Sequence, residues 1–287
     1  MPRLPSVLRF AVALTAGWRP APGLGQIPLA PATASGRTVT PVFEGWYRNA
    51  DGTYSLSFGY FNRNTQEVVE IPIGPDNFIG PGDANQGQPT TFAPRRHWGV
   101  FAVKVPADFG AGKVVWTLRL RGGTFAIPGS LQPDWEIDAL EGEAGGNTPP
   151  ALKLEDDGPE GRGPLGVTAG PVAATLNAPL SLSVWAADDG RAWSSIGSGG
   201  KPGVPVTLTY FKHQGPGSVG FSPASDSVDY HGGKVTVRVT FGEPGLYVLR
   251  VRANDASGVA DAGHAQCCWT NGFVKVIVRP GADHDRI

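Results

Sequence analysis

The 287-residue sequence has room for two ordinary domains and carries a formal net charge of −1. Its 41 glycines and 27 prolines interrupt the chain too often for long helices, which predicts an all-β fold of many short strands. The sequence contains no basic block, so it lacks the positive stripe that neutralises phosphates in nucleic-acid-binding proteins. These features argue against nucleic acid as a partner.

Residues 1–25 have the pattern of a secretory signal peptide. Arg3 and Arg9 give a positive start, the apolar stretch 10–17 follows, and small residues precede position 26. A membrane-spanning helix needs about 20 apolar residues, and neither this stretch nor any later one reaches that length. We therefore expect a mature protein that is secreted or periplasmic and has no membrane span. The alternative is a disordered tail that only resembles a signal.

Strand-like runs fill residues 37–140, which we predict to form an N-terminal β-sandwich domain. Alternation is clearest in 113–120, where Val114, Trp116 and Leu118 share an apolar face and polar residues share the other. The expected strands cover 38–43, 54–61, 68–73, 97–105 and 113–120. This domain resembles uncharacterised secreted bacterial proteins, and the resemblance implies no activity.

A polar loop at 74–97 supplies the first candidate binding residues. Calcium prefers oxygen ligands, so Asp83 and Asn85 with nearby carbonyls would suit this ion. An EF-hand is excluded because Gln88 and Pro94 occupy positions that require Gly and Glu. The same amides beside aromatic residues would suit a sugar-binding groove, and self-satisfied Asx turns are the competing interpretation. The candidates are Asp76, Asn77, Asp83 and Asn85.

Residues 141–170 are poor in apolar side chains and rich in Gly, Pro, Asp and Glu, which predicts a linker and lead-in to a second domain at 171–280. Three blocks, 180–190, 206–217 and 245–255, resemble the strands of a PKD-type, immunoglobulin-like bacterial module. The last block matches the pattern Gly-x-Tyr-x-Leu-x-Val-x-Ala-x-Asp of that family's closing strand. The resemblance implies an immunoglobulin-like β-sandwich with a non-catalytic role in spacing, adhesion or display.

Alternation in the last block predicts a sandwich independently of the resemblance. Tyr247, Leu249 and Val251 fall on one apolar face. We expect that face to share a core with the apolar residues of the strand at 180–184. The central block departs from the family, because Tyr210 stands where a tryptophan is usual.

Both cysteines of the chain are adjacent, in the run His264-Ala-Gln-Cys267-Cys268. Neighbouring residues on a strand point to opposite faces, so a bond between these cysteines would close a strained ring. Four states remain open: a vicinal disulfide, two free thiols, an intermolecular bond, or a copper or zinc site that includes His264. The lack of a second ligand pair favours a disulfide or inert thiols over a metal site.

Topology predicts that two long loops, 188–204 and 254–269, lie at the same end of the second sandwich. Aromatic, carboxylate and imidazole groups would then meet at one tip and form a contact for a ligand or a protein. In the competing interpretation the tryptophans cover the core and the carboxylates stabilise turns. The candidates at the tip are Asp188, Asp189, Trp193, His264, Cys268 and Trp269.

The sequence contains no nucleophile elbow, no phosphate loop and no paired-histidine zinc motif. Its features favour an exported, non-catalytic binding or surface-interaction protein over an enzyme, with a cell-surface glycan or protein as partner. No cofactor is predicted, although calcium, copper or zinc would suit the candidate residues. One alternative is a metal-binding protein or hydrolase with its site in loop 74–97 or at His264, Cys267 and Cys268. Another is a structural spacer.

Overall fold

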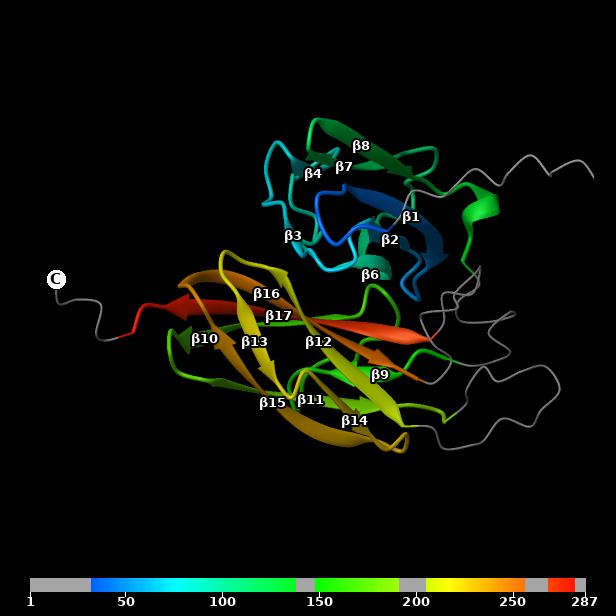
Figure 1. The fold of residues 1–287 in the computed structure, drawn as a ribbon. Helices are drawn as coiled ribbons and strands as arrows, with labels where there is room; N and C mark the ends of the chain where they lie inside the picture. Colours follow the sequence, from blue (N-terminus) through cyan, green and yellow to red (C-terminus); the bar gives the residue numbers. More distant parts are fainter. Residues whose placement is uncertain (1–31, 138–147, 191–204, 256–267, 282–287) are drawn as a thin grey trace, which may run out of the picture. The chain divides into compact units, whose positions relative to one another are not determined.

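The structure is a computed structural model that describes residues 32–137, 148–190, 205–255 and 268–281. In these residues the regular structure is β-strand, apart from one 3-10 turn, η1 (Pro133–Trp135). The prediction of an all-β fold with two sandwiches is therefore confirmed (Figure 1). The predicted signal peptide lies outside the described residues. In the described part, no helix has the length and apolar character needed to cross a membrane.

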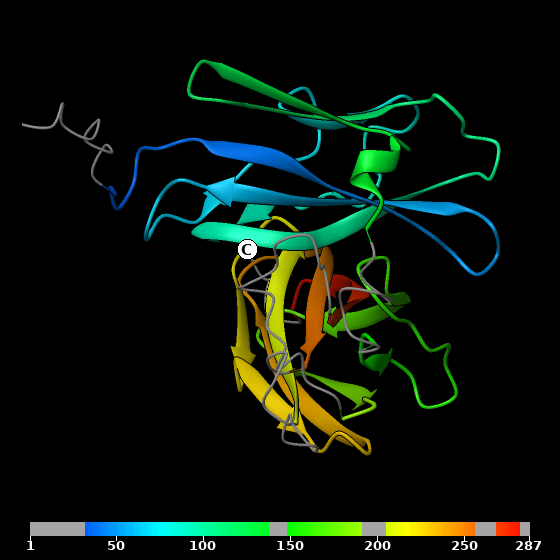
Figure 2. The same cartoon turned by 90° about the vertical axis from the view of Figure 1, so that its right-hand side faces the viewer.

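The first sandwich is built from strands β1 to β8. Its sheets have the orders β1-β2-β6 and β4-β7-β8, and β3 and β5 form a separate pair. Both views of the fold place the β7–β8 hairpin, drawn in green, over the blue strand β1 (Figures 1 and 2). The strands are β1 (Val39–Arg48), β2 (Tyr54–Asn62), β3 (Val69–Glu70), β4 (Asn77–Gly80), β5 (Thr91–Phe92), β6 (Arg95–Val105), β7 (Val114–Leu120) and β8 (Gly123–Gly129).

Aromatic side chains fill the core of the first sandwich. Trp116 and Phe58 are completely buried and meet edge to face, with ring centroids 6.2 Å apart. Phe101 from β6 stacks on Phe58 at 5.5 Å. Val114 and Leu118 belong to the same core, so the apolar face predicted for 113–120 is confirmed.

The second sandwich is built from strands β9 to β17. One sheet has the order β10-β17-β16-β12-β14 and the other β13-β15-β11-β9. Strand β10 runs parallel to β17, and the other pairs are antiparallel. The strands are β9 (Ala151–Lys153), β10 (Val167–Thr175), β11 (Leu180–Ala187), β12 (Val206–Gln214), β13 (Val219–Ser222), β14 (Ser225–Val228), β15 (Gly233–Phe241), β16 (Gly245–Asn254) and β17 (Trp269–Arg279).

The core of the second sandwich contains the face predicted from alternation in 245–255. Tyr247, Leu249 and Val251 are all at most 3% exposed and pack with Val184 of β11. Tyr210, which stands in place of the usual tryptophan, belongs to the same core. Strand β9 lies within residues 141–170, which we predicted to be a linker and the lead-in to the second domain. It pairs with β11 and forms the edge strand of that sheet.

The two sandwiches belong to one compact unit that begins at Thr33. We call the contact of β6 and loop 85–90 with β12, β16 and β17 the seam. The carbonyl of Gly99 on β6 accepts hydrogen bonds across the seam from Asn271 Nδ2 at 2.7 Å and from Trp269 Nε1 at 3.3 Å. The backbone amide of Thr90 donates to the carbonyl of His213 at 2.8 Å.

One arginine of β16, Arg250, is buried in the seam, and Arg252 on the same strand is half-buried. Arg250 is 3% exposed, and its guanidinium lies 4.4 Å from the ring centroid of Phe211. Its Nη1 donates a long bond of 3.3 Å to the carbonyl of Val100, and its Nε has no hydrogen-bond partner. Burial, followed by the nearby charge of Arg252, lowers the pKa of Arg250 to about 9. A charge in this position opposes folding, because it has left water without gaining a carboxylate partner among the described residues.

Candidate functional site

The prediction of one long loop at 74–97 is wrong, because the segment contains β4, β5 and the start of β6, and Asn77 is the first residue of β4. Asn77 is completely buried, and its Nδ2 donates to the carbonyls of Ile71 at 2.9 Å and Pro89 at 2.8 Å. Its Oδ1 accepts a bond from Trp116 Nε1 at 3.0 Å. All three bonds serve the core, so this side chain is not accessible to a ligand.

The other candidates in that segment lie on its surface. Asn85 Oδ1 accepts the backbone amide of Gly87 at 3.1 Å, which is an Asx turn, and also accepts Gln214 Nε2 at 3.1 Å. The backbone carbonyls of Asp76 and Asp83 accept bonds from Arg119 and Gln86. In the described part of the chain, no group of three or more His, Cys, Asp or Glu side chains is arranged to hold a metal ion. Calcium binding at Asp83 and Asn85 stays a prediction.

At the predicted tip, the structure brings Asp188 at the end of β11 close to Asp255 after β16. Burial, then the charge of Asp255, raises the pKa of Asp188 to about 6, and Asp189 adds to the effect. The Asp188 Oδ2 accepts the backbone amide of Gly190 at 3.1 Å, and Asp189 Oδ2 accepts the hydroxyl of Thr148 at 3.1 Å. The candidates Trp193, His264 and Cys267 lie outside the described residues.

Trp269 and Cys268 are buried rather than presented at the tip surface. Both side chains are 0% exposed. Trp269 packs against Gly99 in the seam, so its indole serves the contact between the sandwiches. Cys268 is disulfide-bonded, and its carbonyl accepts the amide of Asp255 at 3.3 Å.

The second sandwich carries an aromatic side chain between two lysines on its outer face. Val184 and Ala186 of β11 point into the core, so Trp185 between them points outward. Its direct cross-strand partners are Lys153 on β9 and Lys234 on β15. Directly opposed residues have Cβ atoms about 5 Å apart, so the three side chains form one row. We call this row the Trp185 platform.

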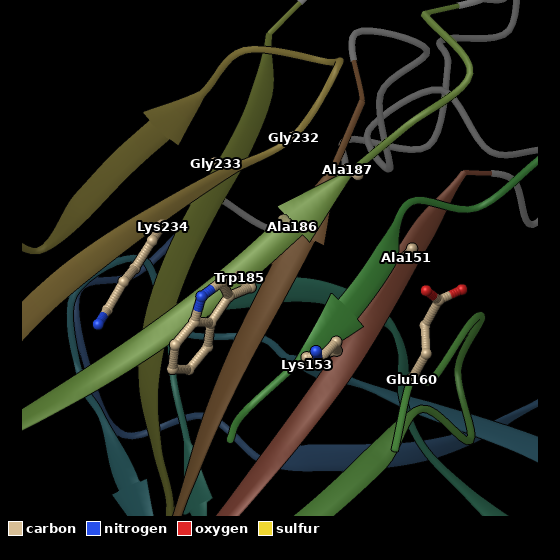
Figure 3. A pocket seen from close by; sticks show the side chains of 9 residues that line it. All are labelled: Ala151, Lys153, Glu160, Trp185, Ala186, Ala187, Gly232, Gly233 and Lys234. Carbon is tan, nitrogen blue, oxygen red and sulfur yellow. The ribbon is translucent and has the colours of Figure 1, made fainter. Parts of the chain in front are cut away.

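The Trp185 platform borders a shallow pocket of about 290 Å³ (Figure 3). Small residues line it: Ala151, Ala187, Gly232 and Gly233, together with Ala186, whose side chain points into the core. Their small size leaves space beside the indole, which larger side chains would fill. Figure 3 shows the indole standing between the two lysines, with Glu160 on the far side of Lys153.

Charged groups of both signs surround the indole. Lys234 Nζ lies 4.8 Å from the Trp185 ring centroid, a cation–π distance. Lys153 Nζ donates to the backbone carbonyl of Asp156. Glu160 Oε1 lies 3.1 Å from Arg162 Nη2 in an exposed ion pair. The pocket therefore offers an aromatic plate with hydrogen-bond donors on both sides and a carboxylate acceptor at one edge.

Sequence reasoning missed Trp185 although a signal for it was present. The prediction that Leu180, Leu182 and Val184 face the core places every second residue of the strand, including Trp185, on the opposite face. A tryptophan on the outer face of a sheet is unusual even when it is half-buried, as Trp185 is. Lys153 and Lys234 gave no comparable signal, because their strands pair with β11 only in the folded chain.

No protein-family model and no curated protein matches the sequence. Among solved structures, the chain is similar to the D0-D1 domain of intimin at 11% identity and a TM-score of 0.26, over 84% of this chain and 97% of that one. It is also similar to the SrpA adhesin R347E mutant from Streptococcus sanguinis at 16% identity and a TM-score of 0.26, over 47% and 60% of the two chains. The fibronectin(III)-like modules of Clostridium thermocellum CbhA give 15% identity and a TM-score of 0.22, over 85% and 95%. TM-scores of this size carry no argument about function.

Proposed function

We propose that the protein is an exported, non-catalytic binding protein that holds a saccharide against Trp185 on the outer face of its second sandwich. The observation that carries the proposal is the outward-facing indole, set directly opposite Lys153 and Lys234 beside a pocket lined by small residues. The leader pattern in residues 1–25 supports export.

A sugar ring matches this arrangement chemically. Its faces present C–H groups, which pack against an aromatic plate, and its rim presents hydroxyls that both donate and accept hydrogen bonds. The Lys153 and Lys234 ammonium groups would donate to those hydroxyls, and the carboxylate of Glu160 would accept from them. The pocket has one open side, so a ring within a longer chain could also be bound there.

The platform stands on hydrogen-bonded strands of a sandwich whose other sheet is joined to the first sandwich at the seam. Asn271, Trp269 and Thr90 join the sandwiches through hydrogen bonds, most of them buried. A contact surface on rigid strands loses little conformational entropy when a ligand binds. Because less entropy is lost on binding, a ligand is bound more tightly by a site on paired strands than by a site on a flexible loop.

A glycan array followed by calorimetry tests the proposal. The expected result is binding of at least one saccharide class to the wild-type protein, with Trp185→Ala weakening that binding about tenfold or more. Trp135→Ala is the control, because Trp135 is a tryptophan that is 48% exposed and lies on η1 of the first sandwich. Trp135→Ala should bind as the wild type does.

Two results would count against this function. One is a glycan array on which the folded protein binds nothing. The other is binding that Trp185→Ala leaves unchanged, because the saccharide would then be held elsewhere. In either case the outer face of β11 would have no role in recognition.

A further inference from the structure

A hollow of about 440 Å³ lies at the seam, separate from the Trp185 platform. Small-ligand sites typically enclose about 300–1,000 Å³, and they occur preferentially where two domains meet. One wall of the hollow comes from loop 85–87 and from Phe101 and Ala102 of β6. The other wall comes from β12, β16 and β17 of the second sandwich.

The polar wall of this hollow is fixed by hydrogen bonds that join the two sandwiches. Gln214 Nε2 donates to Asn85 Oδ1 at 3.1 Å and to the carbonyl of Gln88 at 2.6 Å. His213 Nε2 lies 2.7 Å from the carbonyl of Gly87. The wall therefore forms without a ligand, and a ligand would not bear the entropy cost of ordering it.

Apolar side chains from both sandwiches also line the hollow. Phe101 and Phe273 line it from the two sandwiches, and Val248 lines it from β16. Phe273 also packs against the core of the first sandwich, so its ring is held in place. These side chains offer hydrocarbon surface that a ligand with an alkyl chain would cover, and burying such surface stabilises a complex.

Lys275 supplies the positive charge of the hollow. It is exposed, and it lies directly opposite Val248 across the β16–β17 pair. No carboxylate belongs to the lining residues, and among the described residues Lys275 takes part in no ion pair. His213 adds no charge at neutral pH, because burial and then the charge of Arg250 lower its pKa to about 3.

We propose that the seam hollow binds a single-chain anionic amphiphile, with its alkyl chain against Phe273 and Val248 and its head group at the ammonium of Lys275. An apolar surface next to one cation, which has no ion-pair partner in the described part of the chain, matches the two parts of such a molecule. A neutral chain would leave the ammonium without a partner, and a small anion would leave the apolar surface open to water. This site is independent of the saccharide platform, because the two share no residue.

Calorimetric titration of the full chain with three probes tests the site. Decanoate carries both the chain and the charge, decanol carries the chain alone, and acetate carries the charge alone. Decanoate should bind at one site, decanol about tenfold or more weaker, and acetate not measurably. Because Lys275 is exposed to solvent, salt screens its attraction for the decanoate carboxylate, so the affinity for decanoate should fall as the salt concentration rises.

Three variants locate the binding. Lys275→Gln should lower decanoate affinity to about that of decanol, and Val248→Thr should lower it about threefold or more by replacing a methyl group with a hydroxyl. Lys113→Gln is the control for loss of an exposed lysine elsewhere. Leu246→Ser is a second control, since Leu246 is 72% exposed but does not line the hollow. Both controls should bind decanoate as the wild type does.

Three outcomes would overturn the proposal. The first is equal binding of decanol and decanoate, which would remove the role of the charge. The second is decanoate binding that survives Lys275→Gln and Val248→Thr. The third is binding abolished by Leu246→Ser, which would place the amphiphile outside the hollow, on the exposed part of the same face of β16. Far-ultraviolet circular dichroism of each variant shows whether it is folded, so a loss of binding is assigned to the site only for a folded protein.

Discussion

Gly99 lies against the indole of Trp269, so closely that a Cβ at Gly99 would come within 2.2 Å of Trp269 Cζ2. The backbone of Gly99 also has a φ of +46°, a region that residues with a Cβ rarely adopt. The seam thus depends on the absence of a side chain at one position of β6.

Gly99→Ala should lower the free energy of unfolding by about 3 kcal/mol or more, because it combines left-handed backbone strain with a clash in a buried contact. Gly122→Ala is a matched control, since Gly122 has a φ of +75° and nothing within 4 Å of the added Cβ. The control should lose only about 1 kcal/mol. Urea unfolding measures both, and equal losses would show that the contact with Trp269 is not tight.

Asn271 should be the most sensitive polar residue of the seam. Its Nδ2 donates to the carbonyls of Gly99 at 2.7 Å and Pro164 at 2.9 Å, and its side chain is completely buried. Asn271→Leu removes the donor to the Pro164 carbonyl and leaves the Gly99 carbonyl with only the longer bond from Trp269 Nε1, so we expect a loss of about 2–4 kcal/mol in urea unfolding. Asn254→Leu, at a partly exposed position, should cost less. A loss under about 1 kcal/mol for Asn271→Leu would contradict the hydrogen-bond assignment.

Acid should weaken the seam through His213. Its folded-state pKa, about 3, lies below the ordinary value of 6.5. Between those values the unfolded chain binds more protons at this site, so its contribution to stability falls as pH drops below about 6.5. The fall is up to about 1.4 kcal/mol per pH unit. Burial lowers the pKa of His97 to about 4, which acts in the same direction.

His213→Gln isolates that effect, because a glutamine amide can still donate to the carbonyl of Gly87 but does not titrate. The variant should show a shallower loss of stability between pH 6.5 and 4 than the wild type in urea unfolding at each pH. Identical pH profiles would mean that His213 is not buried in its neutral form.

Replacing the buried charge of Arg250 should not harm the fold. Arg250→Met keeps much of the length of the side chain while removing a cation that has no carboxylate partner among the described residues. We expect stability to stay the same or to rise by about 1–2 kcal/mol. Arg250→Ala should instead destabilise the protein, because it leaves space beside Phe211. Destabilisation of about 3 kcal/mol by Arg250→Met would show that the guanidinium is needed.

Sequence patterns predicted the inside of each sandwich better than its outside. In β16 the odd-numbered residues Tyr247, Leu249 and Val251 were expected in the core and are buried there. On the other face, residue type gives the wrong expectation: Leu246 is 72% exposed, whereas Arg250 is 3% exposed. Alternation shows which residues share a face, but only the packing of the first sandwich decides which part of that face is covered.

The candidate site was harder to predict for the same reason. Asn77 has the polar character of a ligand-binding residue, yet its amide completes the hydrogen bonds of three core groups. Trp185 belongs to a run of apolar residues, yet it faces outward. Loop composition cannot separate a buried amide from an accessible one, since both occur in polar loops and only tertiary contacts distinguish them.

The most direct measurement of the central claim is a nuclear magnetic resonance titration of the tryptophan indole N–H signals with a saccharide found on the array. Our account predicts that the Trp185 signal shifts with saturation, while the signals of exposed Trp135 and buried Trp269 stay where they are. A Trp185 signal that does not move while the saccharide binds would contradict it.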